Sequence, residues 1–292
     1  MCITLYDPGV VKKAARALTA SVTDPQLASA QSATASDVLE QRAADILWRA
    51  AAQHVLVGPP RIAMLNPDLA AGYRVQALNA ARAMSGGRVP AGYKVAMTSA
   101  AVQAQFGIEH PTSGVIFRDT IMKSGAKIEA PLQGRVEGEI AFEMAHDLEV
   151  PDPTLAQVIA CVARALPAIE VVDCRIRDWD LTSFDFVADN AAAAKVVLGT
   201  DEIAVSIDEL ATIAMRIRIN GKVRATGGGA DCTAGPLQAL HWLAVHLIQN
   251  GNRLKAGDII MSGSLGPAAA ISADDTVDVR VGDTCPVRVQ FY

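Results

Sequence analysis

The stretch Val136-Glu137-Gly138-Glu139-Ile140-Ala141-Phe142 alternates charged and apolar residues. Because a β-strand repeats every second residue, both glutamates leave one face of the strand and the apolar side chains line the other. Two like charges at adjacent positions of one face repel each other unless water or a cation lies between them. Glu143 continues the charged face. The stretch alone therefore predicts either a solvated strand face or a strand that helps to bind a cation.

A third carboxylate favours the second interpretation. Glu170 interrupts the apolar run Leu166–Val172, which has the composition of a buried segment. An ionised carboxylate in such a segment is costly unless it has a partner. Glu137, Glu139 and Glu170 together therefore suggest an oxygen-lined site for a hard divalent cation.

Composition limits the class of protein. The chain has 292 residues, 51% of them hydrophobic and 20% charged, which suits one large domain or a small N-terminal layer before a main domain. Its formal net charge of −5, with no basic stripe, argues against nucleic acid as a partner. No apolar run approaches the roughly 18 residues that a bilayer span requires, so we expect no membrane association.

The cellular setting is predicted from the start of the chain and from its cysteines. The first residues carry no basic region followed by an apolar stretch, so no secretory signal is expected. The five cysteines are scattered and lack any Cys-x-x-Cys spacing, which argues against a disulfide framework and against a thiolate zinc site. We therefore expect reduced thiols and a cytoplasmic location.

Three regions are predicted along the chain: an arm at 1–35, a helical layer at 36–90 and a catalytic mixed-β domain at 91–292. The layer contains helices at about 37–54, with Ser36 as a plausible N-cap, and at about 71–84. The rest predicts short strands with few helices, an α+β architecture. Further helices are expected at 100–106, 154–164 and 236–249, and strands at 135–144, 168–174, 194–198, 215–219, 258–261, 277–281 and 287–291, with a hairpin turn at Asn220-Gly221.

Lys94 is the principal candidate for proton transfer. It lies between Tyr93 and Val95, where desolvation would lower its pKa and suit it to acid/base catalysis. The alternative is a lysine whose stem packs while its ammonium group reaches solvent. A second polar cluster, at residues 185–190, lies within apolar sequence and can equally be a turn. The glycine-rich segment at 262–266 offers free amides to an anion, although it has no dinucleotide or P-loop spacing.

These motifs occur in the order that is typical of a known family. The chain from residue 37 to residue 292 resembles the 2-keto-4-pentenoate hydratase family, which belongs to the fumarylacetoacetate hydrolase superfamily and also contains the 4-oxalocrotonate decarboxylases. The resemblance rests on Gly92–Val95, Thr98-Ser99, Pro111, Gly114, Glu137–Glu139, Ala168–Ile176, Asp185–Asn190 and Gly257–Ser264.

The resemblance implies a mixed β-roll or sandwich of the fumarylacetoacetate hydrolase type behind an N-terminal helical layer. It implies Mg²⁺ or Mn²⁺ held by Glu137, Glu139 and Glu170, with Lys94 as the active-site lysine. In such enzymes the metal chelates the 2-oxo oxygen and the adjacent carboxylate of a short unsaturated acid, which stabilises an enolate. The remaining site candidates are Asp185 and His110 for catalysis, and Thr98, Asn190, Ser262, Gly263 and Ser264 for substrate binding.

Three positions depart from the family pattern. Many hydratases carry an acidic residue where this chain has Thr112, a His-Pro pair where it has Gly235-Pro236, and a glycine where it has Ala96. The loss of an acidic group at Thr112 leaves the exact reaction open. His110 is a candidate replacement for proton transfer, and a surface histidine before a turn proline is the alternative.

The predicted activity is hydration of a 2-hydroxypenta-2,4-dienoate-like acid to a 4-hydroxy-2-oxo acid, as in the meta-cleavage breakdown of aromatic compounds. Decarboxylation of a 4-oxalocrotonate-like diacid is the second reading, with Arg118 and Arg175 as candidates for its extra carboxylate, and C–C hydrolysis is the third. A catalytically silent subunit that binds a metal and an oxo acid is the non-enzymatic alternative. We also expect a homo-oligomer, with a pathway aldolase or decarboxylase as a further candidate partner.

Overall fold

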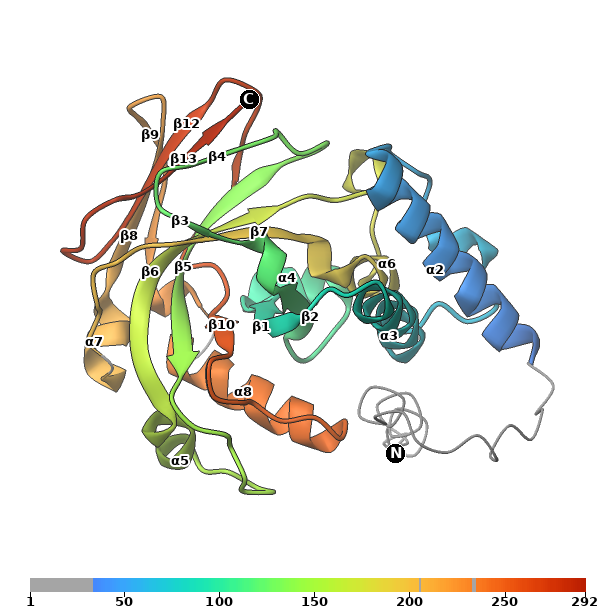
Figure 1. Ribbon diagram of the computed structural model, residues 1–292, viewed down its shortest axis with the longest axis horizontal. Coiled ribbons are helices and arrows are strands. Elements are labelled where there is room, and N and C mark those ends of the chain that lie inside the picture. The colour runs from blue at the N-terminus through green and yellow to red at the C-terminus, as the bar shows by residue number, and fades with distance from the viewer. Residues whose placement is uncertain (1–33, 205, 233–234) are drawn as a thin grey trace.

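Two β-sheets form the centre of the computed structural model, which describes residues 34–204, 206–232 and 235–292 (Figure 1). The predicted arm at 1–35 lies almost entirely outside these residues. The larger sheet has the strand order β2-β1-β10-β5-β6-β7-β3, with β11 beside β5, and the smaller has the order β4-β13-β12-β8-β9. The strands are β1 (Pro90–Ala96), β2 (Thr112–Phe117), β3 (Ile121–Lys123), β4 (Ala126–Ile128), β5 (Arg135–Met144), β6 (Val162–Val172), β7 (Ala193–Leu198), β8 (Ala214–Ile219), β9 (Lys222–Gly228), β10 (Ile259–Met261), β11 (Ala269–Ala270), β12 (Thr276–Val281) and β13 (Val287–Phe291).

All five helices predicted at 37–54, 71–84, 100–106, 154–164 and 236–249 are present, although the fourth ends at Ala160 because β6 begins at Val162. Short helical turns join the strands. The helices are α2 (Ala35–Gln53), α3 (Leu69–Ser85), α4 (Ala100–Phe106), α5 (Leu155–Ala160), α6 (Ser183–Ala188), α7 (Ile207–Thr212) and α8 (Pro236–Gln249). The 3-10 turns are η1 (Pro60–Ala63), η2 (Arg118–Thr120), η3 (Arg177–Trp179), η4 (Asn190–Ala192) and η5 (Gly229–Asp231). Of the described helices, none is long and apolar enough to cross a membrane.

Helix α2 begins two residues earlier than the sequence predicted. Its N-cap is Thr34, whose hydroxyl accepts from the Asp37 amide, while the Asp37 carboxylate accepts from the Thr34 amide. This reciprocal pair satisfies two free amides at once, which a cap at Ser36 would not do. Ser36 therefore lies inside the first turn, where its hydroxyl donates to Glu40.

The strand that carries Lys94 joins the larger sheet through a parallel pair. Strand β1 pairs in parallel with β10 and antiparallel with β2, while β10 pairs antiparallel with β5. Gly92, at φ 144°, allows the close approach of β1 and β10, because a Cβ atom at this position would lie 1.9 Å from the Ile259 carbonyl oxygen. The order places β10 between the strand of Lys94 and the strand of the Glu-Gly-Glu motif.

The two faces of β5 lie in different environments, as the alternation of charged and apolar residues predicted. Val136, Ile140 and Phe142 are fully buried in the main core, together with valines of β12. Gly138 lies on this same face, and a Cβ atom there would come within 2.7 Å of the Met215 side chain. The small residue therefore lets the smaller sheet pack directly against β5. The opposite face carries Glu137 and Glu139.

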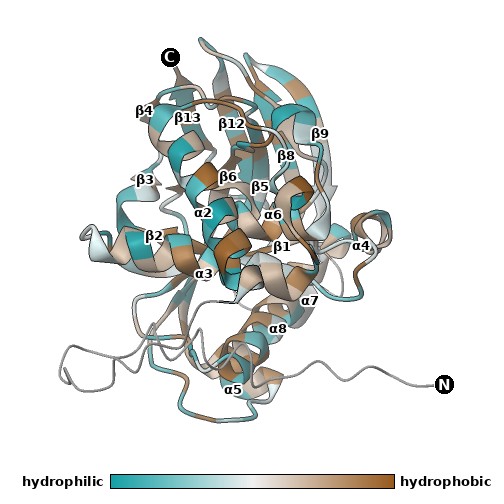
Figure 2. Cartoon of the chain, turned by 90° about the vertical axis from the view of Figure 1, so that its right-hand side faces the viewer, coloured by the Kyte–Doolittle hydropathy of each residue, from teal (hydrophilic) through white to brown (hydrophobic). Residues whose placement is uncertain are grey.

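The N-terminal helices pack on the segment that follows β6. Helices α2, α3 and α6 lie together in both views (Figure 1; Figure 2). Their shared core joins small residues such as Ala43, Ala44 and Ala71 to Ile176 and Phe184. Two mixed sheets behind a helical layer give an α+β architecture, which confirms the fold class expected from the sequence.

Candidate active site

The register of β5 and β6 brings three carboxylates together. The strands are antiparallel, with Glu137 directly opposite Glu170 and Glu139 two residues farther along the same face. Each of the three glutamates offers a carboxylate oxygen that lies within 4.8 Å of the others. The three residues that the sequence singled out therefore form one cluster.

The hydrogen bonding of this cluster leaves two oxygens without a partner. Glu139 and Glu170 are almost completely buried, at 0% and 1% exposure. Glu139 Oε2 accepts from the Gly263 amide at 2.9 Å, but among the described residues Glu139 Oε1 and Glu170 Oε2 have no hydrogen-bond partner. Buried carboxylate oxygens without partners are costly. Three converging carboxylates with free oxygens have the ligand chemistry that a hard divalent cation requires.

Lys94 lies against this cluster on β1. Its Nζ atom is 2.8 Å from Glu170 Oε1 and donates to the Ala191 carbonyl oxygen at 2.8 Å, and its side chain is 2% exposed. The carbonyl is presented by η4, where Asn190, Ala191 and Ala192 all adopt positive φ angles. Non-glycine residues in this region cost free energy and persist where the surrounding structure holds them. The lysine is therefore fixed by two independent partners.

The charges of the cluster shift one another's pKa values. Burial raises the pKa of Glu137 to about 7, with Glu170 adding to the rise and Lys94 opposing it. Burial, Glu170 and Glu137 likewise raise the pKa of Glu139 well above its ordinary value. The sequence argument expected a lowered pKa for Lys94. Burial does lower it, but the three carboxylates outweigh burial and raise the pKa of Lys94 in the cation-free cluster.

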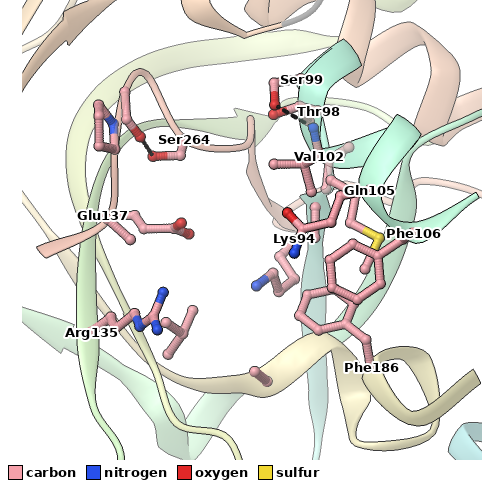
Figure 3. Close-up of a pocket in the computed structure, with 18 of the residues that line it drawn as sticks. Lys94, Thr98, Ser99, Val102, Gln105, Phe106, Arg135, Glu137, Phe186 and Ser264 are labelled. Atoms are coloured by element: carbon pink, nitrogen blue, oxygen red, sulfur yellow. Dashed lines mark hydrogen bonds between the residues drawn. The ribbon is translucent and has the colours of Figure 1, made fainter. Parts of the chain in front are cut away.

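A cavity of about 560 Å³ opens beside the cluster, and Figure 3 shows its lining. Arg135 and Glu137 project from β5 on one side, Lys94 lies between, and Phe106 and Phe186 lie on the other side (Figure 3). The two phenylalanine rings contact each other, with 6.3 Å between their centres. The polar lining residues are Lys94, Thr98, Ser99, Gln105, Arg135, Glu137, Asp231 and Ser264, and the apolar ones include Val95, Met97, Val102, Phe106, Val172, Trp179, Leu181 and Phe186. The cavity is therefore charged on the side of Arg135 and Glu137, whereas aromatic rings and uncharged polar groups lie on the other side.

Four of the five predicted substrate-binding residues divide into two groups. Thr98 and Ser264 line the cavity. Gly263 contributes its amide to Glu139, and the Ser262 hydroxyl accepts from the Ile140 amide and donates to the Gly263 carbonyl. Neither Ser262 nor Gly263 lines the cavity, so their contacts hold β10 to β5 and orient a carboxylate. Gly263 also packs against Thr98, which leaves no room for a side chain.

Three further predicted residues lie outside the cavity lining. The side-chain amide of Asn190 clamps the backbone of Val115, donating to its carbonyl and accepting from its amide at 2.9 and 2.8 Å. The Asp185 carboxylate is fully buried and pairs with Arg61 at 2.6 Å while it caps α6. His110 is exposed. The geometry therefore favours structural tasks for Asn190 and Asp185 and places His110 at the surface.

The arginines proposed for a second carboxylate also lie elsewhere. Arg175 pairs with the buried carboxylate of Asp189 at 2.6 Å, and Arg118 is exposed at η2. The guanidinium group that does line the cavity belongs to Arg135, which the sequence argument missed. Its signal was present, since Arg135 lies two residues before Glu137 and so shares its strand face. Phe106 and Phe186 carried no comparable signal.

Comparison with known proteins places the chain in a family. Residues 91–291 match the family described as fumarylacetoacetate (FAA) hydrolase C-terminal. A 2-keto-4-pentenoate hydratase of Paraburkholderia phymatum is 38% identical over 80% of this chain and 90% of its own length. A 2-hydroxyhexa-2,4-dienoate hydratase of Comamonas testosteroni is 35% identical over 72% of this chain and 81% of its own.

A solved structure supports the same placement. The 4-oxalocrotonate decarboxylase from Pseudomonas putida G7, complexed with magnesium and adipate, superposes with a TM-score of 0.83 at 26% identity, covering 90% of this chain and all of its own. The fold is thus of the fumarylacetoacetate hydrolase type, and both kinds of enzyme named by the sequence resemblance are among the similar proteins. The chain is a member of the 2-keto-4-pentenoate hydratase family, in the hydratase and decarboxylase branch of the fumarylacetoacetate hydrolase superfamily.

Proposed function

We propose that this protein is a divalent-metal-dependent hydro-lyase that adds water to a 2-hydroxypenta-2,4-dienoate-like acid and forms a 4-hydroxy-2-oxo acid. One observation carries the proposal: Lys94 and the carboxylates of Glu137, Glu139 and Glu170 meet beside a cavity, in a chain whose relatives are hydratases of such acids. The setting that this activity implies is the catabolism of aromatic compounds by meta-cleavage.

Glu137, Glu139 and Glu170 would hold the cation. The two partnerless oxygens of Glu139 and Glu170 support this assignment, and so does the presence of magnesium in the related decarboxylase structure. When bound, Mg²⁺ or Mn²⁺ would supply positive charge for the enolate oxygen that develops during the reaction. The Gly263 amide fixes the Glu139 carboxylate in the orientation that leaves its other oxygen free.

Lys94 would move the proton. Its Nζ atom carries a proton in the cation-free cluster, because the surrounding carboxylates raise its pKa. Glu170 and the Ala191 carbonyl hold this atom in one place, so that it can transfer a proton between substrate and water, or between C3 and C5 of the dienol. A positioned acid or base of this kind contributes about 10²- to 10⁴-fold to a reaction rate.

Phe106 and Phe186 would receive the hydrocarbon part of the substrate. They form the apolar side of the cavity, and Phe186 lies with its ring centre 5.9 Å from Lys94 Nζ. With a substrate bound, the rings would exclude bulk water from the lysine, which would strengthen its interactions with charged groups. Asp185 directly precedes Phe186 in α6, so its bond to Arg61 would fix the helix that presents this ring.

Product analysis tests the proposal. The Mg²⁺-loaded protein is mixed with 2-hydroxypenta-2,4-dienoate and separately with 4-oxalocrotonate, and the products are identified by NMR. Formation of the 4-hydroxy-2-oxo acid supports hydration. Loss of CO₂ from the diacid without water addition would favour decarboxylation, the activity named for the similar solved structure. Absence of turnover with both acids, despite metal binding, would indicate a silent subunit.

The assembly and its setting form a second part of the proposal. We infer a homo-oligomer, which analytical ultracentrifugation would reject if it found only a 30.6 kDa species at micromolar concentration. Co-purification with a pathway aldolase or decarboxylase would test for a partner enzyme. The four described cysteines are free thiols, which suits the reducing cytoplasm.

A further inference from the structure

One guanidinium group in the cavity has no carboxylate partner. Arg135 starts β5, shares the face of Glu137 and lines the cavity. Across the described ranges it has no hydrogen bond or ion pair, and its one side-chain contact of note is with the ring of Trp179, at 4.5 Å. By contrast, Arg61 and Arg175 each contact a carboxylate at 2.6 Å. Arg135 therefore has its full set of donors available to a bound molecule.

The indole beneath Arg135 is held in place by the backbone. Asp178 and Trp179 have φ angles of 60° and 56°, and two successive non-glycine residues in this region store strain. Gln133, two residues before Arg135, holds the same loop in place through hydrogen bonds. Its side chain accepts from the Asp178 amide at 2.7 Å and donates to the Ile176 carbonyl at 2.7 Å. These hydrogen bonds hold the strained loop, so that the Trp179 ring is a fixed surface on which the Arg135 guanidinium lies.

The position of Arg135 relative to the reacting groups suggests that task. Two residues on one strand face lie about 7 Å apart along the strand, so an arginine side chain can reach a group bound beside Glu137. Lys94, the other cation of the cavity, is already paired with Glu170. The opposite side, with Phe106 and Phe186, offers aromatic surface and the uncharged amide of Gln105, but no cation (Figure 3). An acid with a hydrocarbon tail therefore matches the cavity best with its carboxylate at Arg135 and its tail at the two phenylalanines.

We propose that Arg135 binds the C1 carboxylate of the substrate, so that the 2-oxo acid end lies at Arg135 and Glu137 and the carbon chain points towards Phe106 and Phe186. This inference rests on the proposed function for its substrate class. A planar guanidinium stacked on an aromatic ring presents two parallel donors, which match a carboxylate. Arg135 is thereby a substrate-binding residue that sets which end of the acid faces the carboxylate cluster and which faces the phenylalanines.

The competing assignment is that Arg135 binds a second carboxylate at the far end of a diacid. Two probe ligands distinguish binding of the C1 carboxylate from binding of a second carboxylate. Isothermal titration calorimetry on the Mg²⁺-loaded protein measures the affinity of 2-oxopentanoate, which has only the C1 carboxylate, and of 2-oxohexanedioate, which has a second one. Wild type is compared with Arg135→Gln, with Arg135→Lys, and with the control Arg88→Gln. Arg88 also stacks on an aromatic ring, at 4.2 Å from Phe117, but it pairs with Asp119 and lies outside this cavity.

Because Arg135→Gln loses a charge-assisted contact, it should bind both probes at least about tenfold more weakly than wild type does. The two probes should lose affinity by a similar factor, Arg135→Lys should lose less, and Arg88→Gln should match wild type. Weakened binding of the diacid alone would overturn the proposal in favour of a second-carboxylate site. Unchanged binding of both probes would overturn it outright.

The proposed function is tested separately, by hydration of the dienoate by wild type. If wild type binds both probes but hydrates nothing, the function fails and the carboxylate contact stands. If wild type hydrates the dienoate and Arg135→Gln binds both probes normally, the carboxylate contact alone fails. Unfolding midpoints of the variants exclude a general loss of structure, which is not expected because Arg135 is exposed at the start of its strand.

Discussion

Replacing Lys94 with methionine separates proton transfer from cation binding. Methionine has a similar length and fills the same buried space, but it carries no proton. Because a positioned acid or base contributes about 10²-fold or more, kcat should fall by at least that factor. In the same variant the Glu170 carboxylate loses its 2.8 Å partner, and breaking a buried ion pair costs about 3–5 kcal/mol of stability in the cation-free protein.

The cation should recover much of that stability, because it supplies positive charge to the same carboxylates. By linkage, the variant should bind Mn²⁺ at least as tightly as wild type, since Lys94 no longer repels the ion. Three measurements are needed: steady-state kcat, Mn²⁺ titration by calorimetry, and chemical unfolding with and without Mn²⁺. Lys123→Met, at an exposed position of β3, is the matched control. Turnover within a few fold of wild type would refute the role of Lys94, and loss of Mn²⁺ binding would refute the charge argument.

Three other changes test the rest of the site. Glu139→Gln should abolish turnover and weaken Mn²⁺ binding by at least the roughly 10- to 100-fold that the loss of an outer-shell partner costs. Glu143→Gln, on the same strand face, should leave turnover and Mn²⁺ binding unchanged. Equal Mn²⁺ affinities of Glu139→Gln and wild type would remove Glu139 from the cation site. The folded-state pKa of Glu137, about 7, lies above its ordinary value of 4.5, so the folded protein binds the extra proton between these values. The stability of the EDTA-treated protein, relative to that of Glu137→Gln, should therefore fall as pH rises from about 4.5 to 7. Mn²⁺ binding in this pH range should release protons. The same pH dependence of stability in wild type and Glu137→Gln would contradict this prediction. Asp185→Asn should lower the free energy of unfolding by about 2 kcal/mol through its bond to Arg61 while Mn²⁺ affinity stays the same; a normal stability with a large loss of kcat would instead make Asp185 a catalytic residue.

Local sequence patterns predicted the helices and strands well where all residues of a segment favour the same secondary structure. Strand β5 was expected at 135–144 and has those bounds, because alternation and burial agree along its whole length. At Asn220 and Gly221 both φ angles are positive, as the predicted hairpin turn requires. The N-cap of α2 was misplaced because Ser36 and Thr34 are equally good caps alone, and only the reciprocal bond with Asp37 distinguishes them.

The candidate site was less predictable, because its geometry depends on pairing between distant strands. The sequence identified the three glutamates and Lys94, but not that Lys94 Nζ lies 2.8 Å from Glu170. Because the sequence did not show that contact, the rise that the carboxylates cause in the pKa of Lys94 was not predicted, and the predicted direction of its shift was wrong for the cation-free protein. Polar motifs at Asp185 and Asn190 were visible too, yet a motif cannot show whether a side chain faces a cavity or ties two loops together.

The insertion of β10 between β1 and β5 determines when the catalytic cluster can form. Strand β1 reaches β5 only through residues 259–261, so the lysine joins the glutamates after most of the chain has left the ribosome. Such distant pairings slow folding, because the entropic cost of closing a long loop comes before any stabilising contact forms. Until then the three carboxylates face one another without their lysine, and a chain that stops short of β10 can relieve this repulsion only by taking up a proton or a cation. The same charges that prepare the site for a cation are thus expected to destabilise an incomplete chain that lacks β10.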